Sequence, residues 1–323
     1  MIKEKVGISC CMITKNEGAN ITQALNSVRN VCRQTVIVDT GSTDDTPRLA
    51  QKSGAEVHFF AWTGSFSDAR NASLSFARCE WILILDADEE IDEESLRHEL
   101  NLLEDNNAGG ININIVNPLR NGETIRHNYT RLFRNVRGIK FEGIIHEQVR
   151  DSIEELGLEV LESDIKILHH GYEKPHPEKL TRNKIMLEKE LKNNPGDTWL
   201  SYHLAMNKFN EGNMSEARRL FVEIHDSEEL TPKQRENCRV RAAQAMLSFD
   251  EYQNVKDILD FSSDDLDLEG LRKFVLAAAF LMEKDIAAAS ELYNSYETGR
   301  SELVDRAALE DAKQLIARIR GYA

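Results

Sequence analysis

The chain has 323 residues, of which 41% are hydrophobic and 29% are charged, a composition typical of globular proteins and unlike that of disordered or collagen-like chains. With 40 Lys and Arg against 55 Asp and Glu, its formal charge of −15 argues against nucleic acid as a main partner. No apolar run approaches the ~18 residues of a transmembrane segment, and the five cysteines lack metal-ligand spacing. We therefore expect a soluble cytoplasmic protein with two domains of about 100–200 residues each.

The first half of the chain alternates short apolar runs with helical patterns. Strands are predicted over 6–13, 34–39, 55–60 and 81–85, and helices over 19–31, 47–53 and 68–77. Because these strands are apolar throughout, they predict a Rossmann-like α/β sheet with helices on both faces. Past residue 90 the pattern changes, since Ile111, Ile113 and Ile115 alternate with asparagines as in a half-exposed strand. Further strands are predicted at 129–134 and 164–169.

The second half of the chain has only helical patterns. Pro175 and Pro177 mark the boundary, which we place between an α/β domain over 1–173 and an all-α domain over 174–323. Ala205, Ala243 and Ala277 mark copies of a helix hairpin at the spacing of tetratricopeptide repeats, with a last helix predicted over 302–318. The middle copy is weak, so an irregular helical bundle is the alternative. Such a repeat would bind a partner molecule or a second copy of the chain, as in a homodimer.

The strongest chemical signal is the segment 81–90 (WILILDADEE). A buried strand would deliver Asp86 and Asp88 to the carboxyl edge of the sheet, where ligands bind in open α/β folds. Two carboxylates there suit Mg²⁺ or Mn²⁺ bridging the phosphates of a substrate. The alternative is an acidic helix start over 89–94 that follows the strand, since Asp-x-Asp is common by chance.

Two more predicted strands end in polar residues at the same edge. The strand over 34–39 ends in Asp39 and is followed by TGSTDDT, and the first strand leads into Thr14, Asn16 and Glu17. A carboxylate at such a place can accept a hydrogen bond from a base or a ribose. Ser42 or its neighbours could instead cap the next helix. Because three strands share this feature, a ligand site is the favoured interpretation.

These motifs together resemble glycosyltransferase family 2. The resemblance rests on 13–17 (ITKNE), 37–44 (IVDTGSTD), 66–71 (FSDARN) and 85–89 (LDADE). It is closest to a bacterial subgroup with a tetratricopeptide-like tail, which includes peptide S-glycosyltransferases and lipopolysaccharide-core glucosyltransferases. The resemblance implies a GT-A fold, a UDP-hexose donor, a divalent metal (Mn²⁺ or Mg²⁺) and inversion at the anomeric carbon.

The resemblance also implies roles for single residues. Asp39 would read the uracil edge, Asp88 would bind the metal, and Asp86 would serve the ribose or the metal. Arg70 would lie near the diphosphate, unless it is an ordinary surface arginine. The implied donor-binding residues are Thr14, Asn16, Glu17, Asp39, Asp68, Arg70, Asp86 and Arg131.

The acceptor side lies in the later segments 131–134 (RLFR), 143–148 (GIIHEQ) and 167–172 (ILHHGY), which resemble motifs of the same subgroup. An inverting transferase needs a general base beside the acceptor. Our first choice is Glu147, followed by His146 and then Glu142; Glu147 could instead pair with an arginine such as Arg131.

Two further assignments concern the metal and the leaving group. His169, in preference to His170, would be a third metal ligand, with a structural histidine as the alternative. Arg131 or Arg134 could neutralise the departing diphosphate.

The predicted function is therefore transfer of a hexose, from UDP-Glc or UDP-GlcNAc, to a protein, peptide or surface-glycan acceptor. One alternative is a sugar-nucleotide nucleotidyltransferase, although these usually carry a Gly-rich basic signature where this chain has TKNE at 14–17. The other is a non-catalytic adaptor that keeps a vestigial donor domain beside its helical repeats.

Overall fold

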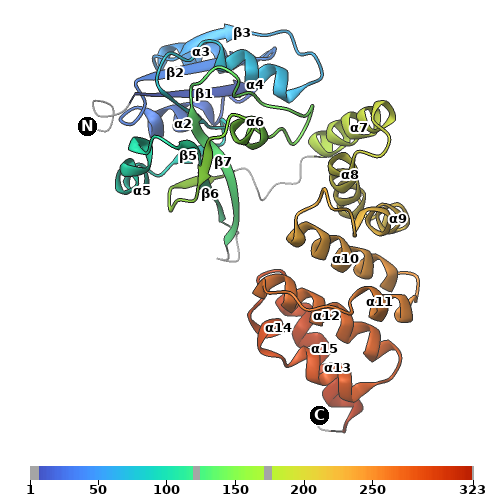
Figure 1. Cartoon of the computed structure of the whole chain (residues 1–323). Helices are drawn as coiled ribbons and strands as arrows, with labels where there is room; N and C mark the ends of the chain where they lie inside the picture. Colours follow the sequence, from blue (N-terminus) through green and yellow to red (C-terminus); the bar gives the residue numbers. More distant parts are fainter. Residues whose placement is uncertain (1–6, 119–123, 171–176, 322–323) are drawn as a thin grey trace. The chain divides into compact units, whose positions relative to one another are not determined.

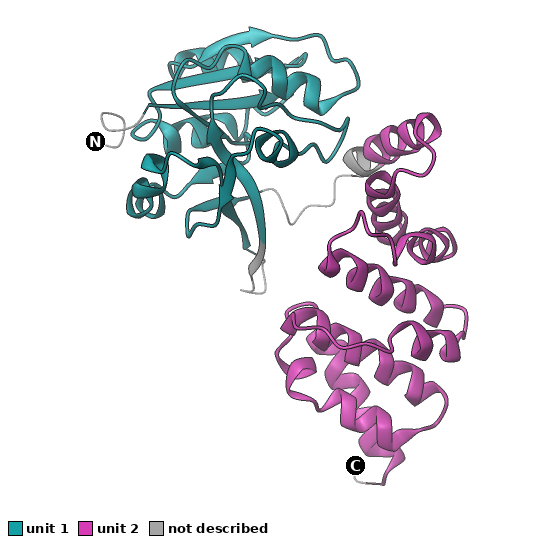
Figure 2. Ribbon diagram, in the orientation of Figure 1, with its two compact units in different colours: residues 1–176 teal, residues 177–323 magenta. Residues whose placement is uncertain are grey.

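The computed structural model describes residues 7–118, 124–170 and 177–321 (Figure 1). The chain divides into two compact units, residues 1–176 and 177–323 (Figure 2). The first is built on a mixed β-sheet with helices, and the second is helical throughout its described residues. This confirms the predicted fold class, an α/β unit followed by an all-α unit. Within the described ranges, no helix combines the length and the apolarity that a membrane crossing needs.

A nine-stranded sheet, with the order β3-β2-β1-β4-β7-β6-β9-β5 and with β8 beside β6, organises the described part of the first unit. Its strands are β1 (Ile8–Thr14), β2 (Gln34–Asp39), β3 (Glu56–Phe59), β4 (Trp81–Ile84), β5 (Glu89–Ile91), β6 (Ala108–Pro118), β7 (Thr124–Arg134), β8 (Glu159–Leu161) and β9 (Lys166–His169). The first four run parallel, and β7 then joins β4 antiparallel. The carboxyl ends of β1, β2 and β4 therefore share one edge, where the register pairs Thr14 with Asp39.

Helices cover both faces of the sheet. Met12 of β1 lies in a core with α2 (Ile21–Val28) and α3 (Thr46–Lys52), whereas Cys11 lies in a second core with α4 (Phe66–Leu74) and α6 (Arg150–Glu154). Because successive side chains of a strand point to opposite faces, an apolar strand such as β1 supplies both cores.

The structure corrects two expectations in this unit. Glu89 and Glu90 lie in β5 rather than in a helix start, and α5 (Glu93–His98) begins only after Asp92, whose carboxylate accepts the N–H groups of its first turn. Asn112 is buried rather than exposed, because its side chain bonds to neighbouring strands and loops. The 3₁₀ helix η1 (Leu100–Glu104), α6 and β8 are further short elements that the pattern does not predict.

The second unit is a succession of helix hairpins. Its helices are α7 (Pro177–Asn193), α8 (Thr198–Asn210), α9 (Met214–Ile224), α10 (Pro232–Leu247), α11 (Tyr252–Ile258), α12 (Leu266–Met282), α13 (Ile286–Tyr293), α14 (Tyr296–Arg300) and α15 (Arg306–Ile319). The pairs α8–α9, α10–α11 and α12–α13 pack together, and Ala205, Ala243 and Ala277 are fully buried in them. The predicted repeat positions thus lie in the helix contacts, including those of the weak middle copy.

The repeat pattern does not predict the helix α14. The short α14 packs on α12, and Gly270 of α12 makes this possible. A Cβ atom at position 270 would lie 2.4 Å from the carbonyl oxygen of Glu297, closer than any side chain allows. The last helix begins at Arg306, four residues later than the pattern predicts.

Candidate active site

The carboxylate of Asp39 is held by the loop that follows its own strand. Its Oδ1 accepts the backbone N–H groups of Gly41 and Ser42 at 3.0 and 2.9 Å, and its Oδ2 accepts the Ser42 hydroxyl at 2.5 Å. The hydroxyl of Thr14 lies 3.3 Å from the same Oδ2. The side chain is 1% exposed. Asp39 thus fixes the start of the loop between β2 and α3 at the carboxyl edge of the sheet.

The loops after β1 and β2 are bonded to each other. Asn16 donates its backbone N–H to the Ser42 hydroxyl at 2.8 Å, and its side-chain oxygen accepts the N–H of Thr43 at 2.8 Å. Its φ of 57° is left-handed, a conformation that asparagine tolerates better than most residues. The N–H of Glu17 similarly donates to the Thr46 hydroxyl at 2.7 Å. The predicted donor residues Asn16 and Glu17 therefore join two loops at this edge.

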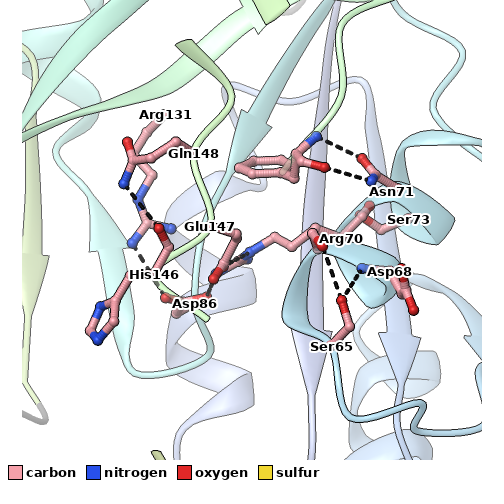
Figure 3. Close-up of polar contacts among 12 residues, drawn as sticks. Ser65, Asp68, Arg70, Asn71, Ser73, Asp86, Arg131, His146, Glu147 and Gln148 are labelled. Atoms are coloured by element: carbon pink, nitrogen blue, oxygen red, sulfur yellow. Dashed lines mark hydrogen bonds and ion pairs between the residues drawn. The ribbon is translucent and has the colours of Figure 1, made fainter. Parts of the chain in front are cut away.

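A buried arginine from α4 joins two carboxylates from distant segments (Figure 3). Arg70 is 6% exposed, and its Nη2 lies 2.8 Å from Oδ1 of Asp86 while its Nε lies 3.0 Å from Oε1 of Glu147. The alternative prediction of an ordinary surface arginine is therefore wrong. Its Nη1 is buried without a hydrogen-bond partner in the described residues. The first candidate base is thus paired with an arginine, but with Arg70 instead of Arg131.

Arg131 of β7 completes this charged cluster. Its Nη2 lies 3.4 Å from Oδ2 of Asp86 and 3.4 Å from Oε1 of Glu89. Burial opposes ionisation of Asp86, but the charges of Arg70 and Arg131 outweigh it and hold the pKa of Asp86 well below its usual range. Burial raises the pKa of Glu89, which is 3% exposed. Glu89 is a member of the cluster to which the sequence assigns no role, because its place in the 85–89 motif and in an acidic stretch does not distinguish it.

The loop that carries Glu147 is closed on itself. The backbones of Glu142 and Gln148 exchange hydrogen bonds of 2.9 and 3.0 Å, and Ile144 between them accepts the N–H of Phe66 at 2.8 Å. His146 has a left-handed φ of 55°, and Figure 3 shows its ring pointing away from Arg70. The Glu147 side chain is 13% exposed and turned toward Arg70. This backbone geometry presents Glu147 to the cluster and leaves His146 at its rim.

Three further residues that the sequence singles out, Glu142, Asp68 and Arg134, lie outside the charged cluster. The exposed Glu142 pairs with Lys140 at 2.6 Å. Asp68 lies exposed on the first turn of α4, where it accepts the hydroxyl of Thr63 at 2.8 Å. Arg134 is paired with Trp81 at the start of β4. It therefore lies at the far end of that strand from Asp86, and its suggested role beside the leaving group is wrong.

Asp88 faces a histidine across the end of the sheet. Nε2 of His169 lies 3.3 Å from Oδ2 of Asp88, while its Nδ1 lies 2.8 Å from the side-chain oxygen of Asn117. His170 instead pairs with Glu90, so the structure favours His169 as the partner of Asp88. Asn117 is a second residue of the site that the sequence did not single out, because an asparagine on a strand gives no signal of its own.

The donor atoms of Asp88 and His169 fit a divalent ion. A carboxylate oxygen suits both Mg²⁺ and Mn²⁺, and a neutral imidazole nitrogen beside it suits Mn²⁺ better than Mg²⁺. Within residues 7–118, 124–170 and 177–321, no group of three or more His, Cys, Asp or Glu side chains could hold a metal by itself. Two protein ligands are what is expected for an ion that is completed by the phosphates of its substrate.

Comparisons with known proteins identify a family for most of the first unit. Residues 9–154 match the family described as Glycosyl transferase family 2. A TPR repeat-containing protein of Synechococcus elongatus is 31% identical over 223 residues, which are 66% of this chain and 55% of that protein. The SPbeta prophage-derived glycosyltransferase SunS of Bacillus subtilis is 29% identical over 204 residues, 60% of this chain and 48% of SunS. The chain thus spans about half the length of these relatives.

A solved structure is also similar over most of the chain. Residues 1–349 of TarS from S. aureus, crystallised with UDP-GlcNAc, are 18% identical, with 91% of this chain and 92% of that one covered and a TM-score of 0.43. The family match over 9–154 includes the charged cluster and Asp88. The chain therefore carries a glycosyltransferase family 2 domain.

Proposed function

We propose that this protein is an inverting, metal-dependent glycosyltransferase that moves a hexose from UDP-Glc or UDP-GlcNAc to a protein, peptide or surface-glycan acceptor. The observation that carries the proposal is the convergence of polar groups at one edge of the sheet. Asp39, Asp86 and Asp88 follow parallel strands there, and Glu147 reaches the same cluster through Arg70. This is the edge at which open α/β sheets bind ligands.

The donor would lie along the loops after β1 and β2. The rigid, cross-bonded loop pair formed by Asn16, Ser42 and Thr43 offers a fixed wall for the base and the ribose. The carboxylate of Asp39 already accepts hydrogen bonds from its own loop. It would therefore bind the uracil edge only by giving up one of them. Asp68, on the first turn of α4, remains a residue that we propose to bind the sugar donor.

Asp88 and His169 would hold the divalent ion. When bound, such an ion neutralises the charge that develops on the departing diphosphate. Arg131 lies beside Asp86 and would add a second positive charge on the same side. Asp86 is already paired with the guanidinium groups of Arg70 and Arg131. It would therefore act on the ion indirectly, through these two residues.

Glu147 would take the proton of the acceptor. Its Oε1 is bonded to Arg70, whereas its Oε2 makes no hydrogen bond within the described part of the chain and can face an acceptor hydroxyl or thiol. A general base of this kind must lie within hydrogen-bond reach of the proton it removes. The closed loop around it provides that fixed position.

The helical unit would bind the acceptor or a second copy of the chain. Its stacked hairpins are the kind of surface that repeat proteins use for extended partners. SunS is named a glycosyltransferase, which supports sugar transfer, and the cyanobacterial relative is named for its TPR repeats, which supports the repeat interpretation of the helical unit. A protein or peptide acceptor is our preferred choice.

The proposal is tested by mixing the purified chain with Mn²⁺ and either UDP-Glc or UDP-GlcNAc, with pyrophosphate added in a parallel reaction, and by following free UDP and pyrophosphate. We expect UDP release, at least by slow hydrolysis without acceptor, that disappears in Asp88→Ala. Pyrophosphate consumption instead of UDP release would support a nucleotidyltransferase. If neither sugar nucleotide is bound in the presence of Mn²⁺, only the adaptor alternative would remain.

A further inference from the structure

Asn117 holds the ring of His169 from the side opposite Asp88. Asn117 is 1% exposed on β6, and its Nδ2 donates to the carbonyl oxygen of Ile115 at 3.4 Å, which orients the amide. Its Oδ1 then lies 2.8 Å from Nδ1 of His169. Because an amide oxygen only accepts hydrogen bonds, the hydrogen of the imidazole must be on Nδ1.

This arrangement leaves a lone pair pointing at a carboxylate. A neutral imidazole carries a single N–H, so Nε2 of His169 is an acceptor, and an ionised Asp88 is also an acceptor. The two atoms lie 3.3 Å apart. Two acceptors face each other favourably only when a proton or a metal ion lies between them, and a neutral ring leaves that place to the ion. The separation suits two adjacent ligands of one ion, since bonds of about 2.1 Å at a right angle place their ends roughly 3 Å apart.

We propose that Asn117 is a positioning residue for the metal site, which fixes His169 in its Nδ1–H tautomer and aims Nε2 at the ion shared with Asp88. This deepens the proposed function and rests on it for the ion. Outer hydrogen-bond partners of this kind orient the ligating histidines of many metal sites. An amide does so without adding charge to a neighbourhood that already contains Asp86, Asp88, Glu89 and Glu90. The ion would then depend on the donor phosphates to complete its shell.

The first experiment measures the tautomer of His169 without any metal. Long-range ¹H–¹⁵N spectra of the full chain, labelled at histidine and recorded at a pH where the ring is neutral, identify which nitrogen carries the hydrogen. The signal is assigned by its loss in His169→Gln. We expect Nδ1–H in the wild type and a shift toward Nε2–H in Asn117→Ala, because Asp88 then favours a hydrogen on Nε2. An Nε2–H ring in the wild type would overturn the inference.

The second experiment measures Mn²⁺ affinity in the presence of UDP, from the free Mn²⁺ signal in electron paramagnetic resonance. We expect Asn117→Ala to weaken binding about 10–100-fold, and Asn117→Asp to retain it because a carboxylate also accepts from Nδ1. The matched control is Asn112→Ala, a buried asparagine of the same strand that bonds to Thr130 and Glu162. Equal loss in both alanine variants would mean a merely structural role and would overturn the inference.

The two experiments separate this inference from the proposed function. If the wild type binds Mn²⁺ with UDP but Asn117→Ala binds it equally well, the inference is wrong and the proposed function stands. If the wild type binds no Mn²⁺ with UDP, the metal dependence of the proposed function fails, and the role of Asn117 toward an ion fails with it.

Discussion

Nε of Arg70 lies 3.0 Å from Oε1 of Glu147, so a buried guanidinium anchors the carboxylate that we propose as the base. The ion pair and the closed loop that carries Glu147 fix the position of this carboxylate. This suits a reaction in which the acceptor gives up its proton only as its bond to the sugar forms.

Replacing Glu147 by Gln should lower kcat about 10²–10⁴-fold, the usual contribution of a positioned base. The affinity for UDP should remain close to that of the wild type, since Gln keeps an oxygen for Arg70. Initial rates and calorimetric UDP binding measure the two quantities. The control is Glu142→Gln, an exposed acid paired with Lys140, which should keep its rate. A variant that loses UDP binding as strongly as turnover would reassign Glu147 to folding or donor binding.

Replacing Arg70 by Met should destabilise the first unit by about 3 kcal/mol. This is the lower end of the cost of breaking a buried ion pair, and we choose it because the Asp86 side chain is one-third exposed. The loss leaves Asp86 and Glu147 without their shared cation. Urea unfolding followed by circular dichroism measures it. Adding Glu147→Gln to this variant should restore part of the stability, since one unpaired charge is removed. Strictly additive effects of the two substitutions would contradict the bridging role of Arg70.

Replacing Gly270 by Ala should destabilise the second unit by about 1–3 kcal/mol, the typical cost of forcing an extra methyl group into a packed contact. The new Cβ would meet backbone of α14, which cannot move aside as a flexible side chain could. Thermal unfolding measures the effect. Gly299→Ala is the matched control, because nothing lies within 4 Å of a Cβ built at that helical glycine. It should be neutral or slightly stabilising. Equal melting temperatures for the two variants would show that α14 does not pack as described.

The ion pair between Glu269 and Arg272 should make the second unit sensitive to acid. Burial opposes ionisation of Glu269, but the Arg272 guanidinium, with Nη2 at 2.6 Å, lowers the pKa of Glu269 below its usual value. Stability from a lowered pKa is present above the unfolded value of about 4.3 and is lost as the pH falls through the folded one. Urea unfolding of Glu269→Gln should therefore show a smaller loss of stability between neutral and acidic pH than the wild type. An identical loss would exclude this contribution.

Much of the fold follows from local sequence pattern. The continuous apolar runs of β1, β2 and β4 predict a buried parallel sheet, and the strand-end acids predict a polar edge. Regions with weak patterns are less well predicted. The strand β5 contains only EEI, a sequence with no apolar alternation, and it forms because β9 pairs with it, an interaction from a distant part of the chain.

The partners within the candidate site are also set by distant contacts. The sequence singles out Arg70, Asp86 and Glu147 one by one, but their pairing joins α4, the end of β4 and a loop 61 residues beyond Asp86 (86 to 147). Glu89 lies in the 85–89 motif without a role assigned to it, and Asn117 lies in no motif. They become part of the site only when β5, β6 and β9 meet. Such residues are found from the fold rather than from the spacing of motifs.

The central claim is that acids at the strand ends hold a metal ion and, through it, the diphosphate of a sugar donor. Calorimetric titration of UDP into the full chain, with and without Mn²⁺, tests it most directly when the wild type and Asp88→Ala are compared. We predict UDP binding that requires Mn²⁺ in the wild type and that Asp88→Ala abolishes. Binding of UDP with equal affinity in all four experiments would contradict it.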